Sequence, residues 1–347
     1  LRWFIGYLRG LRQPMGKIYF NFGEPVVLEQ VPSPEEPREL QRVAFAVGVE
    51  ANRVTPITLP SLLCLVLLGA APRALTADEL ALALQELTAW ARQRDIGLTR
   101  NLQEQDEAQI DGLTEKMIAS GLLTRYDDGP ERVYTIAPEQ HGVASYYRNT
   151  VIHFFVNRAI AELALMHMAQ ENRRGSASFW EDAERLRDLF KFEFFYAPRE
   201  QFRRDVGAEL CRYQPDWEAA LETKGFALTL FMRLRPRVAH AVLLPFVEAY
   251  RVVADVLARQ PQGERLAERD CVQQALAYGR QAYLQRRISS EASIGKLFFS
   301  NGYKLADNFG LIDPGGEQLA ERRRALAQEF RALQRRLERV RAAALPV

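Results

Sequence analysis

Apolar residues recur with a helical period along most of the chain from residue 40 onwards. The spacing predicts helices over residues 40–54 and 59–69. A third helix reaches residue 93, and here Thr76 can cap the first turn while Glu79 completes a capping box. Further helices are expected over residues 107–121, 141–172, 179–195, 202–213, 236–258, 264–288 and 317–345. This pattern predicts a mainly α protein.

The start of the chain has a different pattern. Residues 17–22 (KIYFNF) are rich in β-branched and aromatic side chains and predict a strand, which Gly23 and Pro25 end. An isolated strand leaves its backbone hydrogen-bonding groups unpaired, and no neighbouring segment predicts a second strand. We therefore expect the rest of the sheet to lie upstream of Leu1, which would make this chain a fragment of a longer protein.

Prolines mark the expected domain boundary. Residues 29–39 (EQVPSPEEPRE) contain three prolines, which oppose a regular helix or a central strand, and so predict a linker. Residues 1–28 are then the C-terminal end of an α/β domain, and residues 40–347 form a helical C-terminal domain.

One part of the helical domain predicts a small sheet. The helix over residues 107–121 runs into two short strands, 122–126 and 132–136, joined by the turn sequence DDGP. A helix followed by such a hairpin resembles a winged-helix module. Its candidate recognition helix carries Glu107, Asp111 and Glu115 against Lys116 alone, which opposes contact with phosphates. We expect no nucleic-acid partner, and we expect the module to pack within the larger helical domain.

The last predicted helix combines an apolar seam with a basic outer face. The seam residues are spaced by four and three: Leu326, Phe330, Leu333, Leu337 and Val340. The helix also holds eight arginines against four glutamates. Docking on its own domain is the favoured interpretation, with pairing between helices or contact with anionic lipid as the alternatives.

Two apolar segments allow a core or a surface interpretation. Residues 57–71 are too short and too interrupted to cross a bilayer, so a buried core helix is favoured over an interfacial segment. The aromatic residues between 190 and 196 are expected to lie in the core, with a hydrophobic partner surface as the alternative.

The amino-acid composition indicates an ordinary folded protein and points to no particular catalytic or metal site. The 347 residues are 48% hydrophobic and 26% charged with a net charge of +2, as in an ordinary folded protein with no global attraction for nucleic acid. Three separated cysteines, Cys64, Cys211 and Cys271, exclude a thiolate zinc site and fit a reducing compartment.

The four histidines offer no evident catalytic pair. His153 and His167 lie fourteen residues apart, His141 has no carboxylate within the following turn, and Glu248 lies eight residues after His240, so each histidine is interpreted as a core or surface residue. The sequence also contains no GxGxxG, P-loop, HExxH or GxSxG motif.

Two motifs carry a family resemblance. Residues 16–25 (GKIYFNFGEP) resemble the strand that follows the catalytic blocks in bacterial membrane-bound glycerol-3-phosphate acyltransferases. Residues 137–140 (APEQ), followed by residues 146–153 (YYRNTVIH), look like the helical C-terminal region of that family. The resemblance extends loosely over the whole chain.

The resemblance implies an enzyme that transfers a fatty acyl group from acyl-CoA or acyl-carrier protein to the 1-hydroxyl of glycerol 3-phosphate. It implies no metal or organic cofactor, and a peripheral location on the cytoplasmic face of the inner membrane, with an anionic membrane surface as partner. In this family a His-x4-Asp motif acts as base and orienting carboxylate, and arginines in later blocks hold the substrate phosphate.

The chain departs from the family at the catalytic motif. The fifth residue after each histidine is Tyr146, Arg158, Asn172 or Pro245, so no His-x4-Asp is present and no catalytic residue is assigned in this chain. The substrate-binding residues are likewise unknown. Four residues of the first motif are expected to shape the sheet edge near the active site in a structural role: Phe22, Gly23, Glu24 and Pro25.

Two other functions remain open. A non-catalytic helical interaction or scaffold module is the alternative outside enzymes. A dihydroxyacetone-phosphate acyltransferase is the alternative within them, because the two acceptors differ only at carbon 2.

Overall fold

The computed structural model describes residues 17–28, 35, 37–105, 107–261, 263–315 and 318–344. The chain divides into two compact units, Leu1–Pro56 and Ile57–Val347. The division lies later in the chain than the linker that the sequence predicts over residues 29–39.

The first unit contains an extended segment and one helix. Helix α2 spans Pro37–Val54 and begins three residues before the predicted helix. Residues 17–28 form no strand, although the sequence predicts one over residues 17–22. The described part of this unit offers no second strand to pair with, so the segment instead contacts α2: the Asn21 side chain donates to the Val54 carbonyl oxygen at 2.8 Å.

The second unit begins with the winged-helix module that the sequence predicts. Its elements in chain order are α3 (Leu59–Ala70), β1 (Leu75–Thr76), α4 (Ala77–Arg92), α5 (Arg100–Gln103), α6 (Glu107–Ala119), β2 (Thr124–Tyr126) and β3 (Val133–Thr135). The three strands form an antiparallel sheet in the order β1-β3-β2. Strand β1 is an addition to the predicted hairpin. The predicted capping box at α4 is confirmed, because Thr76 and Glu79 each accept a hydrogen bond from the other's backbone N–H.

Helix α3 joins this module to the rest of the unit. It is buried along most of its length and packs against α7 and α13, which confirms the core interpretation of the apolar segment. Packing within the larger helical domain, as predicted for the winged-helix module, is therefore observed.

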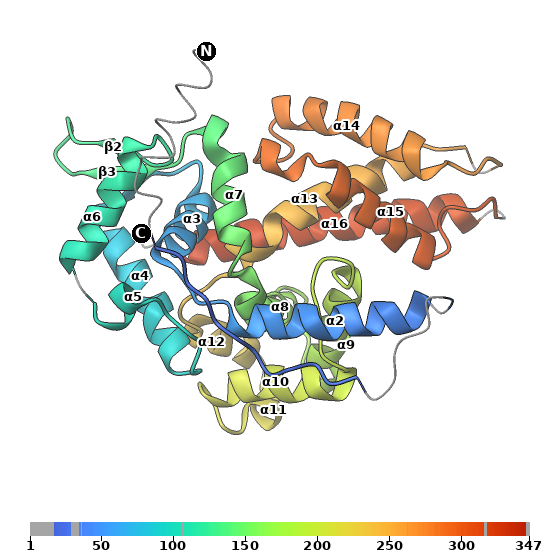
Figure 1. Ribbon diagram of the computed structural model, residues 1–347. Helices are drawn as coiled ribbons and strands as arrows, with labels where there is room; N and C mark the ends of the chain where they lie inside the picture. Colours follow the sequence, from blue (N-terminus) through green and yellow to red (C-terminus); the bar gives the residue numbers. More distant parts are fainter. Residues whose placement is uncertain are drawn as a thin grey trace, which may run out of the picture. The chain divides into compact units, whose positions relative to one another are not determined.

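The remainder is a helical bundle (Figure 1). Its elements are η1 (Pro138–Gln140), α7 (His141–Asn149), α8 (Ile152–Gln170), α9 (Ser176–Leu189), α10 (Arg199–Cys211), α11 (Trp217–Ala220), α12 (Phe226–Arg233), α13 (Ala239–Leu257), α14 (Glu268–Leu284), η2 (Glu291–Ser293), α15 (Lys296–Asn308) and α16 (Gln318–Ala344). Every residue of α13 except Arg251 is buried. Helices α8, α14, α15 and α16 all pack around it, so α13 is the central helix.

The single helix predicted over residues 141–172 is two helices in the structure. Helices α7 and α8 meet at Thr150 and Val151 and are bent by 93°. Three consecutive β-branched residues, from Thr150 to Ile152, weaken the helix here. The Thr150 hydroxyl and backbone N–H both bond the Tyr147 carbonyl, which closes a tight turn instead of extending the helix.

Helix α9 ends at Leu189, six residues before the predicted end. The aromatic residues that follow lie in a loop, and they divide between core and surface. Phe190 is fully buried, and Phe194 and Tyr196 pack against the core, whereas Phe192 and Phe195 are exposed.

Helix α16 docks on its own domain, as favoured from the sequence. All five seam residues from Leu326 to Val340 are buried, and the helix packs mainly against α13. Among the described residues, no individual helix is long and apolar enough to cross a bilayer. Within that described part of the chain, the segments Pro138–Asn149 and Ile152–Gln170, which meet at a sharp bend, reach the necessary length and apolarity only when they are counted together.

Candidate functional site

The four residues expected near the active site lie on the extended segment of the first unit. Phe22 is 93% exposed. Glu24 donates its backbone N–H to the Glu50 carboxylate at 3.2 Å, and Gly23 lies so close to this carboxylate that a Cβ atom would stand 3.0 Å from it. Gly23 and Glu24 therefore border α2, while Phe22 and Pro25 are exposed beside them in the sequence. Their expected role at a sheet edge stays a prediction, because the described part of this unit contains no sheet.

The histidines of α7 and α8 have ordinary structural environments. The His141 ring bonds the Ser290 hydroxyl at 3.1 Å and the Ile136 carbonyl at 3.3 Å, and burial lowers its pKa. His153 packs on the neighbouring Phe154 ring. His167 pairs with Asp182 of α9 at 2.9 Å. Sequence spacing cannot reveal this pair, because its carboxylate comes from a different helix.

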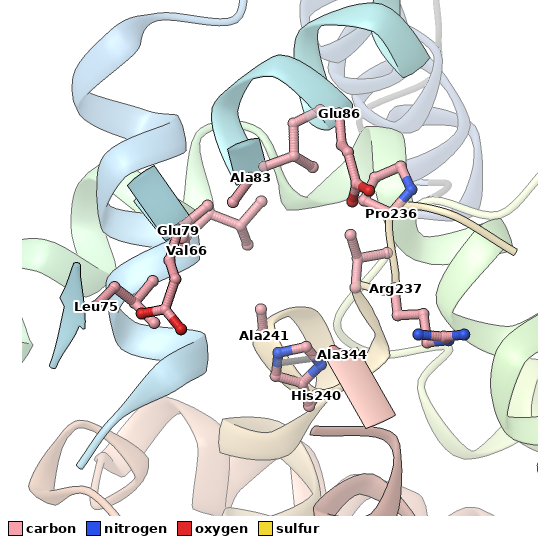
Figure 2. Close-up of a pocket in the computed structure, with 13 residues that line it drawn as sticks. Val66, Leu75, Glu79, Ala83, Glu86, Pro236, Arg237, His240, Ala241 and Ala344 are labelled. Atoms are coloured by element: carbon pink, nitrogen blue, oxygen red, sulfur yellow. The ribbon is translucent and has the colours of Figure 1, made fainter. Parts of the chain in front are cut away.

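His240 is the histidine with an unusual setting. It lies at the start of α13, is buried, and lines a cavity of about 80 Å³ between the winged-helix module and the bundle (Figure 2). The apolar lining comes from α3, β1, α4, the segment before α13, α13 itself and α16: Leu65, Val66, Leu75, Ala83, Leu87, Pro236, Val238, Ala241 and Ala344. Four polar residues complete it: Glu79, Glu86, Arg237 and His240.

Burial lowers the pKa values of two polar groups that line this cavity. Burial and the nearby Arg341 charge lower the pKa of His240 to about 3, so the imidazole is neutral at physiological pH. Its Nδ1 atom has no hydrogen-bond partner among the described residues. Burial also lowers the pKa of Arg237, whose guanidinium donates to the backbone carbonyls of Met232 and Ala343.

This arrangement can bind a small group but lacks the parts of a general base. A catalytic imidazole needs a carboxylate or carbonyl that fixes its tautomer, and His240 has no such bond to any residue that the structure describes. The described residues also contain no group of three His, Cys, Asp or Glu side chains able to hold a metal ion.

In a second polar cluster the charged side chains pair with one another, and this cluster has a structural role. Arg158 of α8 pairs with Glu162 at 3.0 Å and with Glu209 of α10 at 2.7 Å. Arg94 and the Trp90 indole of α4 also bond Glu209. Glu162 accepts the backbone N–H groups of Val238 and Ala239 and so caps α13. The cluster links four helices, and sequence spacing could reveal only its Arg158–Glu162 pair on α8.

Comparison with known proteins decides what this helical region is. Residues 1–315 match the family model described as glycerol-3-phosphate acyltransferase C-terminal region. The chain belongs to this family. The resemblance seen in the two sequence motifs is thereby confirmed.

Named relatives agree with the family. Proteins named putative acyltransferase plsB1 from Mycobacterium bovis and Mycobacterium tuberculosis are each 33% identical over 356 residues, covering 98% of this chain and 56% of the relative. A glycerol-3-phosphate acyltransferase of Pseudomonas paraeruginosa is 26% identical over 254 residues, covering 67% of this chain and 29% of that protein. The chain thus spans about half the length of the plsB1 relatives, and the missing His-x4-Asp motif is consistent with a C-terminal region.

Proposed function

We propose that this chain is the C-terminal region of a glycerol-3-phosphate 1-O-acyltransferase. The whole protein would transfer a fatty acyl group from acyl-CoA or acyl-carrier protein to glycerol 3-phosphate, at the cytoplasmic face of the inner membrane, as an early step of phospholipid synthesis. The observation that carries the proposal is the family match over residues 1–315.

The proposed role of this region is to support a catalytic domain. The buried charges of Arg158, Glu162 and Glu209 are paired with one another, and no histidine of the chain begins a His-x4-Asp motif. Catalysis would then depend on a His-x4-Asp motif outside this chain, with no metal or organic cofactor.

The test is an acyl-transfer assay with labelled palmitoyl-CoA and glycerol 3-phosphate. It compares this 347-residue chain, the product of the longest open reading frame that contains it, and that product with the histidine of its His-x4-Asp motif changed to alanine. We expect activity only in the unmodified longer product. Activity in none of the three, or activity in the 347-residue chain alone, would contradict the proposal.

A second acceptor in the same assay addresses the nearest alternative. Dihydroxyacetone phosphate lacks the carbon 2 hydroxyl of glycerol 3-phosphate, so a site that bonds this hydroxyl discriminates strongly between the two. We expect a much higher kcat/KM for glycerol 3-phosphate. A higher value for dihydroxyacetone phosphate would reassign the substrate without changing the reaction class.

A further inference from the structure

The connection between α14 and α15 exposes two leucines. Leu284, the last residue of α14, is 81% exposed, and Leu297, the second residue of α15, is 70% exposed. Leu284 is the most exposed large apolar side chain in the described part of the second unit. Single exposed leucines are common, but two so exposed at one place indicate a contact surface.

The two leucines lie at the same end of the α14–α15 pair. Gly279 of α14 approaches α15 and the segment just before it so closely that a Cβ atom would stand 3.3 Å from Phe299 and 3.5 Å from Ile294. The end of α14 therefore lies beside the start of α15, and the connection between them closes this end (Figure 1). We call residues 280–297 the α14–α15 tip.

The tip is firmly held on the bundle. The buried Glu248 of α13 accepts the backbone N–H of Ser289 at 2.6 Å and the hydroxyl of Ser293 at 2.7 Å. Arg251 and Gln334 both donate to the carbonyl oxygen of Arg287. These bonds hold the backbone in place from inside, so the outward side chains are displayed by a rigid support.

Cations lie close to both exposed leucines in the sequence. The tip carries Arg280, Arg286, Arg287 and Lys296 against the single acid Glu291. All four cations are exposed, and none forms an ion pair with any residue of the described chain. Arg280 lies one helical turn before Leu284 and therefore on the same face of α14.

We propose that the α14–α15 tip is the surface by which this protein binds anionic phospholipid, with Leu284 and Leu297 inserted among the headgroups. The inference rests on the proposed function and names the part of the molecule that meets the membrane. Stable interfacial binding needs apolar insertion and charge together, and the tip supplies both. A single-stranded nucleic-acid surface would instead present aromatic side chains for base stacking, and exposed leucines do not serve that purpose.

The test is sedimentation of the 347-residue chain with phosphatidylcholine vesicles that contain or lack phosphatidylglycerol. One variant is Leu284→Ser with Leu297→Ser, and the other is Arg280→Glu, Arg286→Glu and Lys296→Glu. Each basic residue near an anionic surface usually contributes about fivefold in binding, so we expect the charge variant, which changes three of them, to lose about 100-fold or more in partition. The leucine variant should lose about tenfold, because it removes both inserted side chains.

Matched controls change exposed residues of the same kinds elsewhere. Leu228→Ser with Met232→Ser removes an exposed apolar pair on α12. Arg324→Glu, Arg335→Glu and Arg339→Glu reverses three exposed charges on α16, the helix for which the sequence left lipid contact open. Both controls should bind vesicles within about twofold of the wild type, since a distant charge is largely screened.

Several results would overturn the proposal. These are equal binding to vesicles with and without phosphatidylglycerol, tip variants that bind like the wild type, or a larger loss from the α16 variant. Binding of the wild-type chain to single-stranded RNA but not to vesicles would assign the tip to a different partner.

Acyl-transfer assays in detergent micelles and on vesicles distinguish a failure of this inference from a failure of the proposed function. In the longer acyltransferase, tip variants should keep full activity on substrates in detergent micelles and lose it on vesicles. Loss in both settings would contradict the tip's assignment, since it would show a defect that does not depend on the membrane. If the wild-type protein bound anionic vesicles but transferred no acyl group, the proposed function would fail and the tip would stand.

Discussion

At the scale of single residues, the burial of His240 predicts that the stability of the fold depends on pH. Burial lowers its pKa in the folded protein to about 3, whereas the unfolded chain has the ordinary value of 6.5. The stabilisation from a neutral His240 is complete above pH 6.5 and falls as the pH drops towards the folded value. Below pH 6.5 the free energy of unfolding should decrease by up to about 1.4 kcal/mol for each pH unit from this group.

Urea denaturation at pH 7.5 and 5.5 checks this dependence. The comparison variant is His240→Gln, which keeps a polar side chain that does not titrate. Because His141 titrates in the same direction and is present in both proteins, the difference between them isolates His240. An equal loss of stability in both proteins would show that His240 is not held neutral.

Glu193 produces a dependence of opposite sign. Burial raises the pKa of this carboxyl to about 7, although Tyr250 and Asn301 donate hydrogen bonds to it. Its stabilisation is complete below pH 4.5 and is lost as the pH rises through 7, because an ionised carboxylate must then stay buried. Glu193→Gln should therefore be more stable than the wild type at pH 8.5, by about 1 to 2 kcal/mol, and nearly equal to it at pH 5.

The measurement for Glu193 is the urea midpoint at both pH values. Glu131→Gln is the control, because Glu131 is exposed on the turn between β2 and β3. It should change stability by less than about 0.5 kcal/mol at either pH. A destabilised Glu193→Gln variant at pH 8.5 would refute the prediction.

At the scale of elements, the crossing of α3 and α13 depends on a glycine. A Cβ atom added to Gly69 of α3 would stand 2.7 Å from the Cβ of Ala241 and 3.2 Å from the His240 ring. Alanine favours a helix over glycine by about 1 kcal/mol, but here it would push two packed helices apart. We expect Gly69→Ala to destabilise the protein by about 1 to 3 kcal/mol.

A second glycine gives the opposite expectation. Gly112 lies in α6 and is exposed, and a Cβ atom there would meet nothing within 4 Å. Gly112→Ala should stabilise the protein by about 0.5 to 1 kcal/mol from helix propensity alone. Thermal unfolding of both variants tests the pair, and the same sign of change in both would contradict the packing argument.

The elements that could be predicted from the sequence are those whose signals are local. The capping box at Thr76, the hairpin after α6 and the seam of α16 all depend on neighbouring residues, and all three are present. The sequence predicts no bend between α7 and α8, because both sides keep a helical apolar period. The bend follows a run of only three β-branched residues, and such a short run does not change the apolar period from which helices are predicted.

Contacts between distant segments were beyond the reach of sequence spacing. The pairing of His167 with Asp182 and the linkage of Glu209 to α4 and α8 arise only after helices have packed. The cavity around His240 likewise needs α3, α4 and α13 in place. The strand expected over residues 17–22 shows the reverse case, where the local signal is clear but no partner strand is present in the described chain to form a sheet.

At the scale of the whole molecule, buried contacts join the winged-helix module to the bundle. Helix α3 is buried against α7 and α13, so the module cannot expose it without losing apolar contacts with the bundle. The charged cluster also crosses this boundary, because Trp90 and Arg94 of α4 bond Glu209 of α10. Separating the two parts would leave buried charges unpaired, at a cost of several kcal/mol.

This organisation predicts how a shortened protein should unfold. Residues 57–347 contain all of these contacts, so a protein with only these residues should fold and lose its structure in one transition. Its three tryptophans report on both parts: Trp90 lies in the winged-helix module, while Trp180 and Trp217 lie in the bundle. Urea unfolding curves followed by circular dichroism and by tryptophan fluorescence should therefore coincide. Glu209→Gln weakens the linkage, so it should lower the common midpoint without splitting the transition. Two separated transitions in the unmodified protein would instead show that the module and the bundle are independent domains.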